Sequence, residues 1–191
     1  MSRKAELFNK KASSPKSRPE EILQALSLKP GQSIADIGSG GGYFTLRFAE
    51  AVGGSGLVYA VDTNQEFLDY IAKNARNRGI ANIKIVPASS IHSMIPGGSL
   101  NVIFLRNVYH HLKNRAEYFR RMSRLLKPEG RIAVIEYDGR GGFSFHKIFG
   151  HYVPQKKIAE EMREAGFKAE KTLDFLPEQS YTIFKKKLKE V

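Results

Sequence analysis

The chain has 191 residues, of which 41% are hydrophobic, and it carries a formal net charge of +12. The sequence contains no cysteine, which excludes disulfide bonds, thiolate metal sites and a cysteine nucleophile within it and favours a cytoplasmic setting. No apolar run approaches the roughly 20 residues of a membrane-spanning helix, and the N-terminal segment lacks the apolar stretch of a signal peptide, so we expect one globular domain.

The two ends of the chain hold most of the excess positive charge. Residues 1–18 carry six basic side chains against Glu6, a net of +5, and residues 185–191 carry four against Glu190, a net of +3. We predict a basic flexible arm over residues 1–18 and a basic tail over 187–191, on either side of a domain at 19–186. Basic ends attract nucleic acid or anionic lipid, but we favour solubilising tails. Phe8 is the single aromatic residue among these charges, which argues against stacking on single-stranded RNA.

Strand-like and helix-like segments alternate through most of the remaining chain. A short helix is expected to begin at Pro19, with two glutamates in its first turn, and to end at Lys29-Pro30-Gly31. Hydrophobic patterning then predicts strands at 33–37, 57–61, 83–86, 100–105 and 131–137, and helices at 43–52, 65–78 and 115–126. This alternation is typical of a parallel sheet with right-handed crossovers.

The pattern changes after residue 137. Residues 138–153 are rich in glycine and aromatic residues, and a helix at 154–165 precedes two strands at 167–175 and 180–186. No helix fits between these two strands, so we predict that they are antiparallel. The fold class that follows is a doubly wound, Rossmann-like α/β fold. It has a mostly parallel seven-stranded sheet, helices on both faces and a C-terminal antiparallel hairpin.

A glycine-rich turn joins the first strand to the next helix. It reads Asp36-Ile37-Gly38-Ser39-Gly40-Gly41-Gly42-Tyr43, and a strand, such a turn and a helix are a common way to hold a nucleotide-like cofactor. A dinucleotide fingerprint starting at Gly38 would need glycine or alanine at position 43, where the chain has tyrosine. The segment resembles motif I of class I S-adenosylmethionine (SAM) methyltransferases, which reads roughly D-x-G-x-G-x-G.

This resemblance implies roles for the residues of the turn. Asp36 would lie near the methionine part of SAM. The backbone of Gly38, Ser39 and Gly40 would approach the carboxylate of SAM, where the following helix N-terminus favours negative charge. Tyr43 would cover the cofactor.

The ends of the next two strands supply further candidates. Asp62 closes the second predicted strand, where an acid can accept hydrogen bonds from the ribose hydroxyls. The structural alternative, in which Asp62 caps the next helix together with Thr63, is compatible with this role. After the third strand, relatives often have an aspartate that contacts adenine. Here Ala88 takes its place, so Ser89, Ser90 or backbone groups would recognise adenine.

The run after the fourth strand reads Arg106-Asn107-Val108-Tyr109-His110-His111. It resembles the strand-four motif of small-molecule methyltransferases, and its first part is similar to ubiquinone/menaquinone C-methyltransferases of the UbiE/COQ type. The resemblance places Arg106 against the methionine part of SAM. His110 or His111 is the candidate general base, with packing or capping of the turn as the equally weighted alternative.

The resemblance implies a SAM-dependent methyltransferase that moves a methyl group to a small-molecule acceptor by in-line displacement and leaves S-adenosylhomocysteine (SAH). No metal is expected, since Asn101 replaces a carboxylate that a metal-dependent site would use. His151 and Tyr152 are expected to line the acceptor pocket, while the phenylalanines of 138–153 pack a lid. An enzyme acting on RNA or protein and a non-catalytic SAM-binding module are the alternatives. An N-P-P-Y-like motif of amine methylation is absent.

Overall fold

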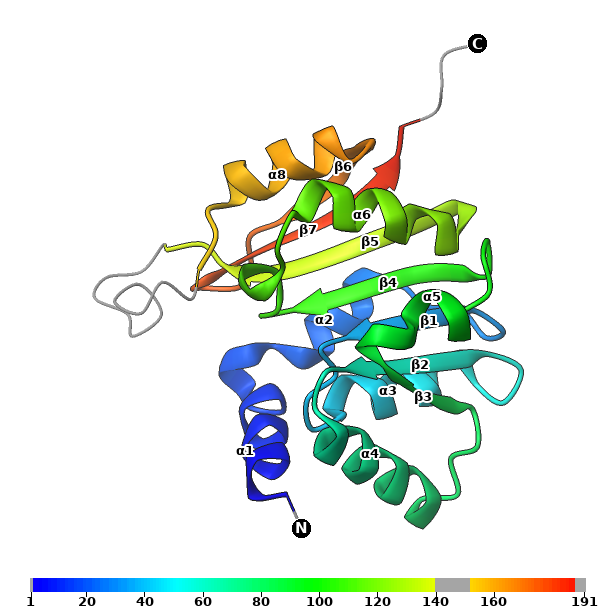
Figure 1. Ribbon diagram of the computed structural model, residues 1–191. Helices are drawn as coiled ribbons and strands as arrows, with labels where there is room; N and C mark the ends of the chain where they lie inside the picture. The colour runs from blue at the N-terminus through cyan, green and yellow to red at the C-terminus, as the bar shows by residue number, and fades with distance from the viewer. Residues whose placement is uncertain (1, 140–151, 188–191) are drawn as a thin grey trace.

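The computed structural model describes residues 2–139 and 152–187, which form a layered α/β structure around one sheet (Figure 1). The seven strands lie in the order β3-β2-β1-β4-β5-β7-β6, and β7 alone runs against the other six. This confirms the predicted fold class, including the C-terminal hairpin. The strand bounds are β1 Ser33–Ile37, β2 Leu57–Asp62, β3 Ile83–Pro87, β4 Leu100–Arg106, β5 Leu126–Tyr137, β6 Phe167–Leu173 and β7 Gln179–Lys186.

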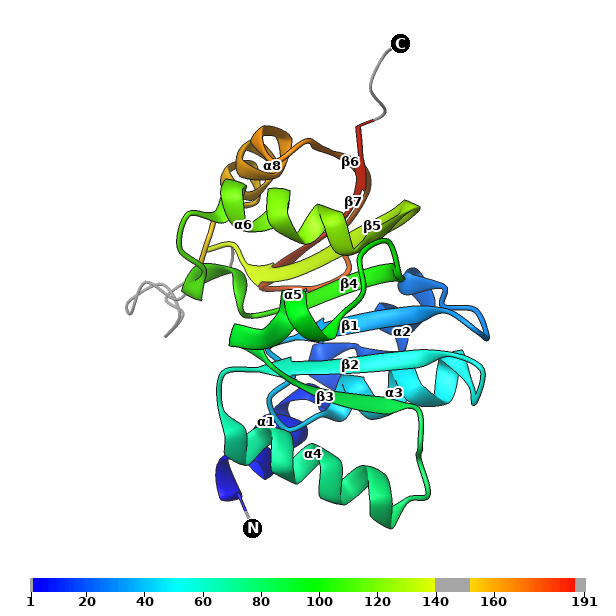
Figure 2. The same ribbon diagram turned by 45° about the vertical axis from the view of Figure 1, so that its right-hand side comes forward.

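Helices cover both faces of the sheet, as the alternating pattern predicts (Figure 2). Buried side chains of α2 and α3 pack on one face, and those of α5, α6 and α8 pack on the other. α4 packs along β2 and β3. The helix bounds are α1 Arg3–Ala12, α2 Pro19–Leu26, α3 Tyr43–Val52, α4 Gln65–Asn77, α5 Ile91–Met94, α6 Arg115–Met122 and α8 Gln155–Glu164.

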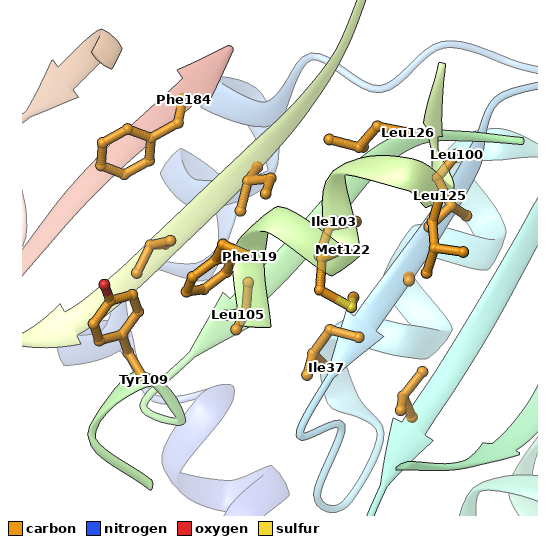
Figure 3. Close-up of a cluster of buried hydrophobic side chains, with 14 of the residues drawn as sticks. Ile37, Leu100, Ile103, Leu105, Tyr109, Phe119, Met122, Leu125, Leu126 and Phe184 are labelled. Carbon is orange, nitrogen blue, oxygen red and sulfur yellow. The ribbon is translucent and has the colours of Figure 1, made fainter. Parts of the chain in front are cut away.

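The larger core cluster fixes the turn that follows β4 (Figure 3). Tyr109 is fully buried in this cluster, and its ring stacks on Phe119 of α6 at a centroid distance of 5.4 Å. The Tyr109 hydroxyl donates to Glu161 Oε2 of α8 at 2.8 Å, and Arg115 Nε donates to the same oxygen at 2.8 Å. Two helices thus hold the residue that directly precedes His110.

The N-terminal segment differs from the predicted arm. Residues Arg3–Ala12 form a regular helix, with Ser2 at its N-cap accepting a hydrogen bond from the Ala5 amide. Glu6 in its first turn and two lysines in its last turn match the helix dipole. Ala5 and Ala12 are buried against the rest of the protein, so tertiary contacts stabilise a helix that its polar composition did not indicate.

Three smaller differences concern element boundaries. Residues 88–94 form a 3₁₀ turn and the short α5, which were not predicted. The predicted helix over 115–126 ends at Met122 and continues as a 3₁₀ turn. β5 begins at Leu126 rather than residue 131, because Leu126 pairs with Leu100 before the register shifts over the Pro-Gly segment. Among the residues that the structure describes, no helix is both long and apolar enough to cross a membrane.

Candidate functional site

The parallel strands β1 to β5 end at one edge of the sheet, and most of the predicted site residues follow these ends. Gly38 follows β1, Asp62 ends β2, Ala88 follows β3, and Arg106 ends β4. Register pairs Asp62 with Pro87, which places the end of β3 beside that of β2. The carboxyl edge of such a sheet is where open α/β proteins bind ligands. The structure therefore gathers these candidates along the same edge.

The glycine turn is tied to β2 through its backbone. The amides of Gly38 and Ser39 both donate to the Val61 carbonyl oxygen, at 2.8 and 3.1 Å. Gly38 has a φ of +71°, and a Cβ at this position would overlap the Val108 side chain. The first glycine is therefore required both by its left-handed backbone and by the close approach of the segment after β4.

Asp36 lies in the buried interior of the site. Its Oδ2 accepts a hydrogen bond of 2.6 Å from the Thr45 hydroxyl, in the first turn of α3. Burial raises the pKa of Asp36 to about 7; the hydrogen bond with Thr45 opposes this shift, and the negative charge of Asp62 adds to it. A carboxyl in this state is predisposed to ionise when a cation is placed beside it.

Asp62 links the glycine turn to the beginning of α4. Its Oδ2 accepts from the Gly40 amide at 2.9 Å, and its Oδ1 accepts from the Asn64 amide at 2.9 Å. The predicted capping role of Thr63 is wrong, because Thr63 is exposed and Asn64 occupies the N-cap, where its Oδ1 accepts from the Glu66 amide. The hydrogen bonds to its two oxygens thus fix the orientation of the Asp62 carboxylate.

Two buried polar atoms at this edge have no partner among the described residues, Ser39 Oγ and Arg106 Nε. The Arg106 guanidinium lies over the Phe44 ring at 5.5 Å, and its Nη2 donates to Ser17 Oγ at 3.1 Å. Burial lowers the pKa of Arg106, although Tyr137, Asp36 and Glu136 act in the opposite direction. Unsatisfied buried polar groups of this kind call for a ligand, and their donor character suits the carboxylate end of a SAM-like molecule.

The adenine-side candidates and Tyr43 lie at the flanks. Ala88 is half-buried and Ser89 exposed, in the 3₁₀ turn directly after β3. Tyr43 is the first residue of α3 and is half-buried, and its hydroxyl accepts from Arg47 Nη1 at 3.2 Å.

The two histidines have different surroundings. His110 Nδ1 lies 3.0 Å from Glu136 Oε2, and the His110 backbone amide donates to the same oxygen at 3.2 Å. Glu136 is fully buried near the end of β5, and its Oε1 accepts from the Tyr137 amide at 2.9 Å. His111 is exposed, and its ring centroid lies 4.0 Å from that of His110. The two contacts with Glu136 fix the position of His110, which makes it the better candidate of the two histidines for the general base.

Sequence reasoning missed Glu136 and the N-terminal helix as parts of this region. An acid at a strand end was an available signal for Glu136, since the same signal identified Asp62. No motif pointed to α1, whose residues contact the glycine turn.

Residues 152 and 153 also lie at this edge of the sheet, beside the end of β5. The Val153 amide donates to the Tyr137 carbonyl oxygen at 2.8 Å, and Tyr152 packs on Gly139. This brings Tyr152 close to the end of β5. Residues 140–151, including His151 and the three phenylalanines proposed for lid packing, lie outside the described part of the chain, as do residues 188–191 of the predicted tail. Within the described part, no group of three or more acidic or histidine side chains could hold a metal ion.

Known proteins resemble this chain in sequence and in fold. The family described as a methyltransferase domain matches residues 28–187. The ubiquinone/menaquinone biosynthesis C-methyltransferase UbiE of Vibrio parahaemolyticus is 33% identical over 110 residues, which cover 57% of this chain and 42% of that protein. The corresponding protein of Ectopseudomonas mendocina is 28% identical over 131 residues, covering 68% of this chain and 51% of that protein. The chain thus spans about half the length of these relatives.

Solved structures support the same fold. A SAM-dependent methyltransferase from Aquifex aeolicus superposes with a TM-score of 0.80 at 20% identity, covering 92% of this chain and 96% of that one. A putative type 11 methyltransferase from Sulfolobus solfataricus gives a TM-score of 0.69 at 19% identity, covering 93% and 95%. The chain therefore belongs to the methyltransferase-domain family, as a class I member that resembles the UbiE type.

Proposed function

We propose that this protein is a SAM-dependent methyltransferase that acts on a small-molecule acceptor. The observation that carries the proposal is the meeting of two oriented acids, Asp36 and Asp62, with the unsatisfied Ser39 and Arg106 groups around one glycine turn. Membership of the methyltransferase-domain family supports it, and the similarity to UbiE proteins favours a small acceptor. A cytoplasmic location stays a prediction from the cysteine-free sequence.

Different residues around the turn would hold different parts of the cofactor. Asp36 offers a carboxylate to the positively charged methionine end, and Ser39 and Arg106 offer donors to its carboxylate. Asp62 would accept from the ribose hydroxyls. Gly38 and Gly40 allow close approach to the backbone, Tyr43 and Thr63 flank the site, and Ala88 and Ser89 border the adenine side. When bound, SAM supplies an activated methyl carbon on a sulfonium.

We assign proton removal to His110. Because a carboxylate oxygen accepts hydrogen bonds, Glu136 Oε2 beside Nδ1 favours the tautomer in which His110 carries its ring proton on Nδ1. Nε2 would then be the nitrogen that takes the proton of the acceptor, and bound SAM would supply the methyl group that replaces this proton. This arrangement suits an acceptor with an acidic hydroxyl or C–H group.

Ligand binding tests the cofactor assignment directly. SAM and SAH are expected to raise the thermal unfolding temperature, whereas NAD is expected to leave it unchanged. Asp62→Ala should reduce the shift strongly, because one partner of the ribose is lost. Stabilisation by NAD in place of SAM would contradict the proposal.

Turnover needs its own measurement. Radiolabelled methyl from SAM is expected to appear in the small-molecule fraction of a cell extract. Label in the RNA or protein fraction would favour a macromolecular acceptor, and SAM binding without label in any fraction would indicate a binding module.

A further inference from the structure

Helix α1 packs directly on the glycine turn. A Cβ on Gly41 would overlap the Ala5 carbonyl oxygen, and the Phe8 ring lies 3.4 Å from the corresponding position on Gly40. Phe8 also makes an edge contact with Phe67 of α4 at 5.5 Å between centroids. In Figure 1, α1 lies beside the ends of the strands, at the edge where the site residues gather. Gly41 is thus needed for the close approach of this helix.

Asn9 makes the specific part of this contact. Its Nδ2 donates to the Gly41 carbonyl oxygen at 2.8 Å, and its Oδ1 accepts from the Tyr43 amide at 3.0 Å. One side-chain amide therefore bridges the residues on both sides of Gly42. A side-chain amide offers a neutral donor and a neutral acceptor side by side in one plane.

The bridge compensates for a missing helix cap. The N-cap of α3 is Gly42, with a φ of +82°, and it has no side chain that could accept a hydrogen bond. Asn9 supplies the acceptor from another helix. Capping of this kind fixes the first turn of a helix and the direction from which the chain enters it.

The same backbone carries the groups assigned to the cofactor. Gly40 donates to Asp62, and the Gly42 amide donates to the Ser39 carbonyl oxygen at 2.8 Å, which closes the turn. Thr45, in the capped first turn of α3, donates to Asp36. A shift at residues 41–43 would therefore move the partners of both acids.

We propose that Asn9 is a positioning residue of the cofactor site, which acts through the backbone of Gly41 and Tyr43 rather than by touching the cofactor. This inference rests on the proposed function. It assigns a role in cofactor affinity to a residue of the N-terminal helix, outside the part of the chain that matches the methyltransferase-domain family.

The chain offers a matched control at the opposite end of α3. Asn82 Nδ2 donates to the carbonyl oxygens of Ala49 and Gly53 at 2.9 and 2.8 Å, so it caps the C-terminus of the same helix. Asn9→Ala and Asn82→Ala each remove two hydrogen bonds between a side-chain amide and the backbone of this helix or its flanks. Only the first removes them beside the glycine turn.

The test measures SAH and SAM affinity of the full chain by titration calorimetry. Asn9→Ala is expected to weaken both by about three- to tenfold, as expected for loss of a helix cap, whereas Asn82→Ala should change them by less than about twofold. Amide hydrogen exchange at Tyr43 should accelerate in Asn9→Ala and stay slow in Asn82→Ala. Asn9→Asp, which keeps the acceptor and loses the donor, should also weaken binding.

Unchanged SAH affinity in Asn9→Ala, or equal weakening in both alanine variants, would overturn the positioning role. Thermal unfolding of each variant shows that the folded protein is compared. If the unmodified protein bound neither SAM nor SAH, the proposed function itself would fail, which is a different result from a failure of Asn9.

Discussion

Asp36 provides a quantitative prediction about the cofactor-free protein. Burial holds its pKa at about 7, compared with 3.8 for the ordinary carboxyl group. The folded state therefore keeps this proton up to about pH 7, while the unfolded chain releases it near pH 3.8. The stability from this group is fully present below pH 3.8 and is lost as the pH rises through about 7.

The size of the effect follows from the two pKa values. A difference of about three pK units corresponds to about 4 kcal/mol at full ionisation, at about 1.4 kcal/mol per unit. Between about pH 5 and about pH 7.5, the free energy of unfolding should fall by about 2 to 3 kcal/mol through Asp36 alone.

The perturbation is Asp36→Asn, which keeps the size of the side chain and an acceptor for Thr45 but does not titrate. Urea denaturation of both proteins across this pH range gives the difference in their free energies of unfolding. We expect the variant to gain about 2 to 3 kcal/mol relative to the unmodified protein as the pH rises. Asp174→Asn, at an exposed position, controls for the general loss of a negative charge. A difference that stays constant with pH would refute the reasoning.

The remaining predictions concern the glycine turn and the histidine pair. Gly38→Ala should lower the free energy of unfolding by at least about 2 kcal/mol more than Gly79→Ala. Both positions have a left-handed backbone, but of the two only Gly38 lacks room for a Cβ. Similar losses of the two variants in urea denaturation would contradict the packing argument. Glu136→Gln should reduce methyl transfer from labelled SAM by about a hundredfold, because Nδ1 of His110 loses its anionic partner, while SAH affinity is retained. Exposed Glu129→Gln is its control, and a parallel loss of SAH binding would assign Glu136 a structural role instead.

The sequence contains enough local information to predict the sheet and its cofactor edge. Alternation of apolar runs with helical patterns gave the strands, and the lack of a helix between residues 175 and 180 gave the antiparallel hairpin. Asp36, Gly38 and Asp62 could be found because the two acids lie at or next to the end of a strand and Gly38 directly follows one. These signals depend on residues that are close in the chain.

The missed features depend on contacts between distant residues. The polar composition of residues 3–12 indicated no helix, since the helix is stabilised by Asn9 and Phe8 on a turn more than 30 residues away. The proposed role of Glu136 depends on His110, which lies 26 residues earlier in the chain. The two residues meet because β4 and β5 are paired in the sheet. The N-cap of α4 is Asn64, one residue after Thr63, because the extended backbone of Asn64 lets its side chain accept from the Glu66 amide.

The position of α1 also has a consequence for the order of folding. A helix of 10 residues is marginal in water on its own, and the partners of α1 in the glycine turn and α4 come from residues 40 to 67. Helix α1 therefore gains its packing surface only when the glycine turn and α4 have folded. Hydrogen exchange in α1 therefore reports on the folding of the glycine turn and α4.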